Sequence, residues 1–438
     1  MKKRFDAYAG FLFSKDLKNI EILAIAVLLT WGYCTNLLLL EFQPDETYWI
    51  ASSVRFDKLL AGDFSAPIWS VDPYTSYEVR PISSYLAAIG QRLGGIERSS
   101  LPIYWIWELS TQENISLGAW PSDTVLWWSR LPMAILSAFS ITGIALLLAG
   151  AHSRMAAYAF TLVSFNTYFL TQLRRVLSEP PQILFTALTL YASYKLIVVA
   201  QERSLKQVVL WSAAVGVFSG LAGQSKLTGL ACAGIAILGT MILMSDPTKS
   251  VDLTRRRIPL IIAIVVFSVM LLTFIASYPF FYENTIDRIL TTFGTRSYVL
   301  QYQINRYAYQ MIPEDARLDI LFQRIFKYPV NLDTSGTGIA FFHWINLILT
   351  ALGIYYCIQQ IRQRQKDWEY FVVFLSGAFV CAFPMILTPL DWERYYLYPI
   401  FFSCIFFSLG IGQLLFMEVS YIQRQQNERL RTSERLET

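Results

Sequence analysis

Two adjacent carboxylates, Asp45 and Glu46, follow an apolar run in the stretch EFQPDETYWIA, residues 41–51. A carboxylate in such a place can take a proton from a substrate hydroxyl. The plainer alternative is a helix N-terminal cap, where Asp and Glu are common. Cationic side chains recur further along the chain, at Arg80, Arg174, Arg175, Lys226 and Arg394. What these residues can do depends on the elements that carry them.

The composition predicts an integral membrane protein. Of 438 residues, 54% are hydrophobic and 16% are charged, and the mean hydropathy is +0.40. Apolar runs of about 20 residues match helices that cross a bilayer, whereas a membrane barrel would show shorter alternating segments. The sequence therefore predicts an all-α polytopic fold with about ten spans, near residues 20–40, 125–150, 156–172, 181–200, 208–222, 227–244, 258–277, 341–359, 369–388 and 396–418.

Lys and Arg in the short loops predict the orientation, because positive charge is retained on the cytoplasmic side. Both termini are expected in the cytoplasm, and the first apolar run is expected to remain as a signal anchor. Residues 1–438 then form one domain in the plasma (inner) membrane. It has outer segments at 41–124 and 278–340 and a cytoplasmic tail at 419–438. Asp45 and Glu46 are placed at the outer mouth of the first span.

The first outer segment carries a helical apolar pattern. Ile82, Tyr85, Leu86, Ile89 and Leu93 recur at the spacing of one helix face. Such a pattern predicts a helix lying on the membrane surface. Tyr and Trp are dense in this segment, which is typical of residues at the headgroup level.

Several chemistries are disfavoured by the residues available. The two histidines and five cysteines do not have the spacing of metal ligands, and the cysteines fall within or at the ends of predicted spans. A Ser-His-Asp triad, a nucleotide loop and nucleic-acid binding are likewise not indicated. We expect no cofactor and no metal, and leave open a divalent ion shared by Asp45 and Glu46.

Six motifs in fixed order resemble the GT-C membrane glycosyltransferases. They are PDETYW, YEVRPISSYLAAIGQRLGG, WWSRLPMAILSAFS, LRRVLSEPPQILFTALTLYA, GLAGQSKLTGL and WERYYLYPIFF. The nearest branch is the protein-mannosyltransferase-like group that includes the lipid A aminoarabinose transferase. The resemblance covers nearly the whole chain.

The resemblance implies transfer of a sugar from a polyprenyl-phosphate donor to an acceptor hydroxyl of a lipid, glycan or protein, on the extracytoplasmic face and with inversion. Asp45 then matches the base, and Glu46 orients it or binds a substrate hydroxyl. Cations stabilise the departing phosphate. The implied donor-site residues are Arg80, Lys226, Arg394, Tyr395, Arg174 and Arg175, with Glu179 and Arg130 in support. Arg80 and Ile82 replace a family Lys and a family proline, which leaves the sugar open.

Each cation also has a structural alternative. Arg80 could anchor a lipid headgroup, and Lys226 could extend to the interface. Arg174 or Arg175 could pair with Glu179, and Arg394 with a nearby acid. Arg288 and Arg296 of the second outer segment are further candidates.

Two other functions fit the same charges. A transporter or flippase of a lipid-linked anion also places charges at an intramembrane cavity, although transporters more often show internal repeats. A catalytically silent membrane subunit would keep the fold and lack the chemistry.

Overall fold

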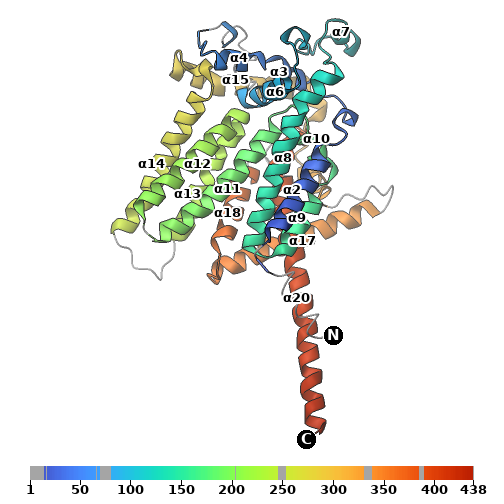
Figure 1. The fold of residues 1–438 in the computed structure, drawn as a ribbon, viewed down its shortest axis with the longest axis vertical. Coiled ribbons are helices and arrows are strands. Elements are labelled where there is room, and N and C mark those ends of the chain that lie inside the picture. The colour runs from blue at the N-terminus through green and yellow to red at the C-terminus, as the bar shows by residue number, and fades with distance from the viewer. Residues whose placement is uncertain are drawn as a thin grey trace.

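The computed structural model describes residues 14–15, 17–65, 67–69, 80–202, 204–244, 253–329, 338–383 and 389–437. In this part of the chain the regular elements are helices (Figure 1). The α-helices are α2 (Asn19–Cys34), α3 (Glu46–Ala51), α4 (Val54–Leu60), α6 (Pro81–Leu93), α7 (Thr111–Ser116), α8 (Asp123–Ala151), α9 (Arg154–Val163), α10 (Thr167–Gln172), α11 (Glu179–Glu202), α12 (Leu205–Ser225), α13 (Ala233–Met244), α14 (Leu253–Ala276), α15 (Thr285–Arg306), α16 (Arg317–Phe326), α17 (Gly338–Arg362), α18 (Glu369–Gly377) and α20 (Leu397–Glu437). Shorter elements include the 3₁₀ helices η1 (Leu37–Leu39), η4 (Leu227–Cys232), η5 (Pro279–Phe281) and η8 (Glu393–Tyr396) and the π-helix η7 (Ala378–Ala382).

Seven helical stretches in the described residues are long and apolar enough to cross a membrane. They are Asp123–Ala151, Glu179–Glu202, Leu205–Ser225, Leu227–Met244, Arg257–Ala276, Phe342–Arg362 and Glu393–Gln425. Two shorter apolar helices, Asn19–Cys34 and Glu369–Ala382, coincide with further predicted spans. The prediction of an all-helical, multi-pass membrane protein is therefore confirmed, while the count of ten spans stays a prediction.

The span expected at 156–172 is interrupted in the structure. α9 ends at Val163 and α10 begins at Thr167. Asn166 caps α10, because its side-chain oxygen accepts a hydrogen bond from the backbone N–H of Phe169 at 2.8 Å. Hydropathy does not reveal this break, since the capping residue lies inside an apolar run.

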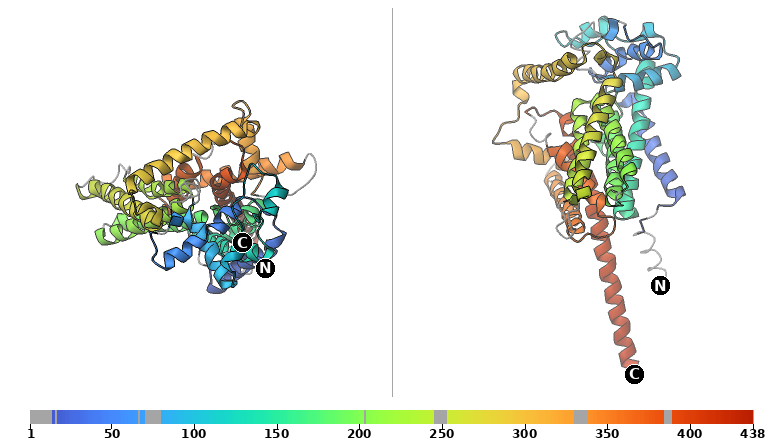
Figure 2. Two further views of the ribbon diagram at one scale, coloured as in Figure 1. Left: turned by 90° about the horizontal axis from the view of Figure 1, so that it is seen from above. Right: turned by 90° about the vertical axis from the view of Figure 1, so that its left-hand side faces the viewer.

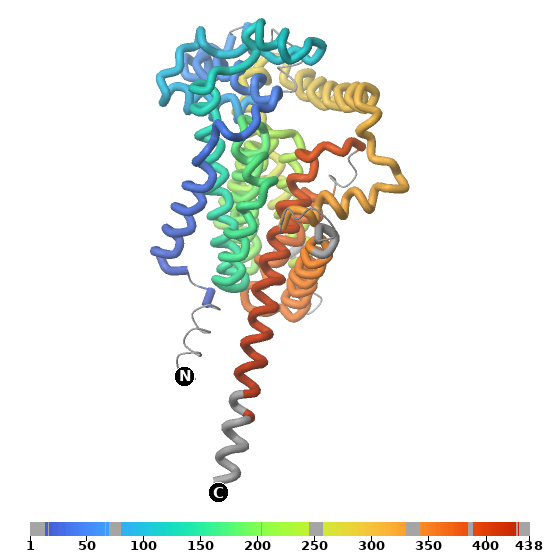
Figure 3. Tube along the Cα trace, turned by 90° about the vertical axis from the view of Figure 1, so that its right-hand side faces the viewer, coloured from blue at the N-terminus to red at the C-terminus, as the bar shows by residue number. Residues whose placement is uncertain are grey.

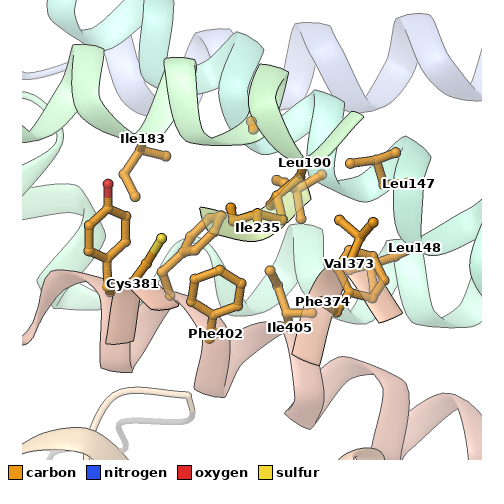
Figure 4. Close-up of a cluster of buried hydrophobic side chains, with 14 of the residues drawn as sticks. Leu147, Leu148, Ile183, Leu190, Ile235, Val373, Phe374, Cys381, Phe402 and Ile405 are labelled. Carbon is orange, nitrogen blue, oxygen red and sulfur yellow. The ribbon is translucent and has the colours of Figure 1, made fainter. Parts of the chain in front are cut away.

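The bundle core lies between α8, α11, α13, α18 and α20. Figure 4 shows side chains from these helices meeting, among them Leu148, Leu190, Ile235, Phe374 and Phe402. All five are buried, with at most 2% of the side chain exposed. Close packing of this kind holds spans together where lipid is as apolar as the helices themselves.

Glycines permit two helices to cross at backbone contact. A Cβ added at Gly353 of α17 would lie 1.9 Å from the carbonyl oxygen of Phe406, and one added at Gly410 of α20 would lie 2.0 Å from that of Leu349. Only glycine fits such an approach. This crossing fixes α20, whose N-terminal end adjoins the candidate site.

A layer of shorter helices covers one end of the bundle. α3, α4, α6 and α7 of the first outer segment and α15 of the second make up this layer, which we call the cap layer (Figures 1 and 2). The beginning of α2 and the projecting end of α20 lie at the opposite end (Figures 1 and 3). The expected helix after Arg80 is α6, which leaves Ile89 and Leu93 exposed and packs its small residues on α8.

A charged network ties the cap layer together. Asp57 of α4 accepts hydrogen bonds from Arg92 at 2.7 Å and from Arg98 at 2.6 Å. Burial by itself raises the pKa of Asp57, but the two guanidinium groups outweigh it and hold the pKa below its usual value. These ion pairs join α4 to α6 and to the loop that follows α6, within the layer that also carries Asp45.

Candidate functional site

Asp45 lies where α3 begins, at the junction of the cap layer and the bundle. It occupies the N-cap position of α3, but its side chain makes no capping hydrogen bond. One carboxylate oxygen instead contacts the guanidinium of Arg394, which is 349 positions away in the sequence. The side chains of Asp45 and Arg394 are 15% and 24% exposed, so both remain accessible. The contact joins the first outer segment to the start of the last span.

Arg394 stands in η8 among aromatic and charged neighbours. Its guanidinium carbon lies 5.0 Å from the ring centre of Trp392 and 5.8 Å from that of Tyr395. It also interacts electrostatically with Glu179. Aromatic faces favour a planar cation in such positions.

Lys226 and Glu179 form the other half of the group. The Lys226 ammonium lies 2.8 Å from a carboxylate oxygen of Glu179 and 5.7 Å from the ring centre of Tyr395. Asp45, Glu179, Lys226, Arg394 and Tyr395 thus form one contiguous group, which we call the Tyr395 cluster. It contains two acids, two cations and a phenol drawn from four separate parts of the sequence.

Local sequence explains where Lys226 and Glu179 lie. Lys226 is the C-cap of α12 with an extended backbone, and the tighter η4 follows it directly. Lys226 therefore lies in the turn between two candidate spans, and its side chain reaches Glu179 of α11. Glu179 is the first residue of α11 and precedes two prolines, which suit the first helical turn because they lack an N–H. Its negative charge also suits a helix N-terminus.

Glu46 has a different environment from its neighbour Asp45. Its side chain is fully buried and paired with Arg130, with atoms 2.6 Å and 2.9 Å apart. The backbone N–H groups of Gln43 and Val176 also donate to it, at 3.1 Å and 2.9 Å. Four hydrogen bonds use most of the capacity of a carboxylate. Glu46 is thus placed to hold the backbone that presents Asp45.

Arg130 completes this support from α8. Besides Glu46, it donates to the carbonyl oxygens of Leu37, Leu40 and Glu41 at 2.7, 2.8 and 3.3 Å. These carbonyls follow the end of α2, so one guanidinium fixes the whole turn from α2 to α3.

Arg174 and Arg175 contact the same turn and not Glu179. Arg174 donates to the carbonyl oxygen of Thr35, and Arg175 donates to that of Glu41 at 3.1 Å. Burial lowers the pKa of both guanidinium groups, and the nearby positive charge of Arg130 lowers it further. The hydrogen bonds of Arg174 and Arg175 thus go to the turn that leads to Asp45, outside the Tyr395 cluster.

Arg80 is buried at the N-cap of α6, with its guanidinium carbon 5.9 Å from the ring centre of Phe274. Ser83, one turn further along α6, donates to the carbonyl oxygen of Leu177 at 2.8 Å. Arg80 therefore belongs to the junction between the cap layer and the bundle. Its role in holding a donor stays a prediction.

Sequence reasoning did not find a second network that holds η8. Arg324 of α16 donates two hydrogen bonds to the Asp391 carboxylate, at 2.9 and 2.6 Å. Tyr328 donates to the Glu393 carboxylate at 3.1 Å, and Tyr168 donates to the Glu393 carbonyl at 2.9 Å. Hydrogen bonding to Asp391 raises the pKa of Arg324, while burial raises that of Tyr328. No spacing in the sequence links Arg324 to Asp391.

The acids near Arg394 bear on the question of a metal ion. In the residues that the structure describes, no group of three or more His, Cys, Asp or Glu side chains is arranged to hold one. Glu46 turns away from Asp45 into its pair with Arg130, so the two do not share a face. The expectation that no cofactor is needed stays a prediction.

The arrangement suits chemistry on an anionic substrate. An accessible carboxylate, Asp45, contacts Arg394 in a cluster that also holds Lys226, and a phosphate could engage both cations. Each cation is held by an acid in this structure, Arg394 by Asp45 and Lys226 by Glu179. A phosphate bound here would compete with Asp45 for Arg394 and with Glu179 for Lys226.

Residues 105–291 match the model of the family described as dolichyl-phosphate-mannose-protein mannosyltransferase. No curated protein matches the chain in sequence.

Solved structures of an oligosaccharyltransferase from Archaeoglobus fulgidus share the fold. The apo form is 13% identical with a TM-score of 0.53, and the match covers 94% of this chain and 52% of that one. The form tethered with an acceptor peptide is also 13% identical, with a TM-score of 0.50 and coverage of 90% and 49%. This chain therefore spans about half the length of those proteins. The resemblance expected from the sequence is confirmed: the chain is a multi-pass membrane protein with the GT-C fold, similar over residues 105–291 to the protein mannosyltransferases.

Proposed function

We propose that the protein is a glycosyltransferase that moves a sugar from a polyprenyl-phosphate donor to an acceptor hydroxyl on the extracytoplasmic face of the membrane. The observation that carries the proposal is the contact between Asp45 and Arg394, beside Lys226, Glu179 and Tyr395. It places an accessible base against one cation, Arg394, in the cluster that also holds Lys226.

Asp45 acts as the base. The acceptor oxygen forms a bond to the anomeric carbon and gives its proton to the Asp45 carboxylate. The bond from that carbon to the phosphate oxygen breaks, and its electron pair leaves with polyprenyl phosphate. Attack from the side opposite the leaving group inverts the anomeric carbon.

Arg394 and Lys226 receive the phosphate. As the glycosidic bond breaks, negative charge grows on the leaving oxygen, and cations fixed at that position lower the barrier. When the donor binds, its phosphate draws Arg394 away from Asp45, so that the carboxylate is free to accept the proton of the acceptor hydroxyl.

Glu46 keeps Asp45 in place and does not react. Its buried pair with Arg130 and its two backbone hydrogen bonds leave little capacity for a substrate or an ion. We therefore propose that the phosphate is held by side chains without a divalent ion.

The donor class and the acceptor follow from the comparisons by analogy. The matching family is described by a dolichyl-phosphate sugar and a protein acceptor, and one structural neighbour holds an acceptor peptide. For this chain we propose a lipid-linked hexose or pentose and an acceptor that is a lipid, a glycan or a protein. The distribution of Lys and Arg supports cytoplasmic termini and an active site on the outer side of the plasma (inner) membrane.

The test is release of free polyprenyl phosphate. Membranes that contain the protein would be supplied with a panel of polyprenyl-phosphate sugars and a total membrane extract as the acceptor pool. Asp45→Asn keeps the shape of the side chain and removes the base. The matched control is Glu41→Gln, since the Glu41 side chain is exposed four residues away.

Release by the wild type and by Glu41→Gln, together with its loss in Asp45→Asn, would support the proposal. Release that survives in Asp45→Asn would exclude Asp45 as the base. If no donor released polyprenyl phosphate in the presence of folded protein, the transporter and the silent subunit would become the better readings.

A further inference from the structure

The amphipathic helix α15 has an apolar stripe that stays exposed among the residues that the structure describes. Ile286, Leu290 and Phe293 recur at i, i+4 and i+7, and their side chains are 74%, 65% and 47% exposed. Leu300 and Ile304 continue the stripe and are half-buried. Large apolar side chains exposed together on one face usually meet a partner surface.

The helix lies across the bundle. In the right panel of Figure 2, α15 runs nearly horizontally, whereas the spans below it run nearly vertically. Figure 3 shows it crossing the upper part of the molecule in the same way. A helix that lies across the spans at their end is at the level of the membrane surface.

The stripe continues a surface that must meet lipid. α14 is a candidate span whose apolar window is only 22% buried. It exposes Phe267, Leu271 and Leu272, and η5 leads from its end directly into α15. Tyr282, at this junction, is also exposed. The chain therefore passes from a span with an exposed apolar side, through a short junction, into the helix that carries the stripe.

The neighbouring face of α15 touches the Tyr395 cluster. Arg296 donates to the Tyr395 hydroxyl with the atoms 3.3 Å apart, and Gln303 accepts from that hydroxyl at 3.4 Å. Thr292 and Val299 lie on the same face and are buried. At its C-terminal end, Arg306 contacts Glu108 of the first outer segment at 3.1 Å.

We propose that α15 is an interfacial membrane-binding helix, whose Ile286–Leu290–Phe293 stripe inserts into the bilayer leaflet on the side of the cap layer. The partner is the acyl boundary of bilayer lipid, which is chosen because α14, a candidate span with most of its apolar window exposed, leads through η5 into α15. One face of the helix then lies in lipid while the next face holds Arg296 and Gln303 against Tyr395. The depth of α15 in the leaflet sets the position of those two side chains.

The proposal can be tested by measuring the depth of α15. An environment-sensitive fluorophore would be attached at Leu290→Cys, in protein that carries Cys34→Ser and is reconstituted into vesicles of phosphatidylethanolamine and phosphatidylglycerol. The other four native cysteines are buried. The matched control is Thr291→Cys, which is exposed on the next face of the same helix.

The label at 290 is expected to emit at shorter wavelength and to be quenched by nitroxide-labelled lipid at least about twofold more strongly than the label at 291, as for a helix face buried ~5–10 Å into the interface. Phe293→Cys serves if Leu290→Cys does not fold. Equal quenching at both positions would overturn the proposal. So would quenching at 290 that polyprenyl phosphate displaces, because a donor chain and not bilayer lipid would then cover the stripe. The measurement needs no sugar transfer, so its outcome is independent of the proposed function.

Discussion

Removing Arg130 should destabilise the protein strongly, because it leaves a buried carboxylate without its cation. In Arg130→Met, Glu46 keeps its hydrogen bonds from Gln43 and Val176 but loses both from the guanidinium. The carbonyl oxygens that Arg130 binds after α2 lose their donor as well. Breaking a buried ion pair from one side costs about 3–5 kcal/mol, and we expect a loss of stability of that size.

The assay is equilibrium unfolding in mixed detergent micelles, followed by circular dichroism. The exposed pair of Arg306 and Glu108, whose side chains are 33% and 65% exposed, supplies the control. Arg306→Met should destabilise the protein far less than Arg130→Met, because solvent screens an exposed pair.

A double variant separates charge from shape. Adding Glu46→Gln to Arg130→Met removes the unpaired buried charge and should recover at least about 1 kcal/mol of the loss. The reasoning would be refuted if Arg130→Met cost less than Arg306→Met, or if Glu46→Gln made it worse.

Three further predictions concern the supports of the site. The pKa of Asp57 is lowered, so its ion pairs stabilise the folded state fully above the unfolded pKa of about 3.9. Stability should therefore fall as the pH drops from that value through the folded pKa. In a series of thermal midpoints against pH, Asp57→Asn should make this fall shallower. Gly410→Leu should lower the free energy of unfolding by about 3 kcal/mol through overpacking against α17. The control Gly143→Leu should unfold like the wild type, because a Cβ added at Gly143 meets nothing within 4 Å. Equal effects of the two substitutions would contradict the close crossing of α17 and α20. Arg324→Ala should slow turnover about 10–100-fold, because η8 would no longer be held in place. Arg324→Lys should recover part of the rate. Unchanged kinetics would show that this arginine does not position Arg394.

Much of the site depends on residues that local pattern alone could not pair. Asp45 and Glu46 are adjacent and both are carboxylates, yet Asp45 is partly exposed and contacts Arg394, whereas Glu46 is fully buried and paired with Arg130. Which acid is accessible depends on how α3 sits on α8, and the sequence carries no signal of that. Arg174 and Arg175 show the same limit, because their short loop suggested pairing with Glu179 and their bonds go to the turn after α2.

The amino-acid sequence by itself determined that this chain crosses a membrane as helices. Buried backbone groups in lipid must be satisfied within each span, so a long apolar run has few other structures open to it. The tertiary structure decided the rest. It broke the span at 156–172 with a cap, turned α12 at Lys226, and brought Asp45 and Arg394 together across 349 positions. Such contacts arise when whole helices pack against one another. Packing depends on two surfaces that come from distant parts of the chain, so a pattern within one stretch of sequence cannot predict it.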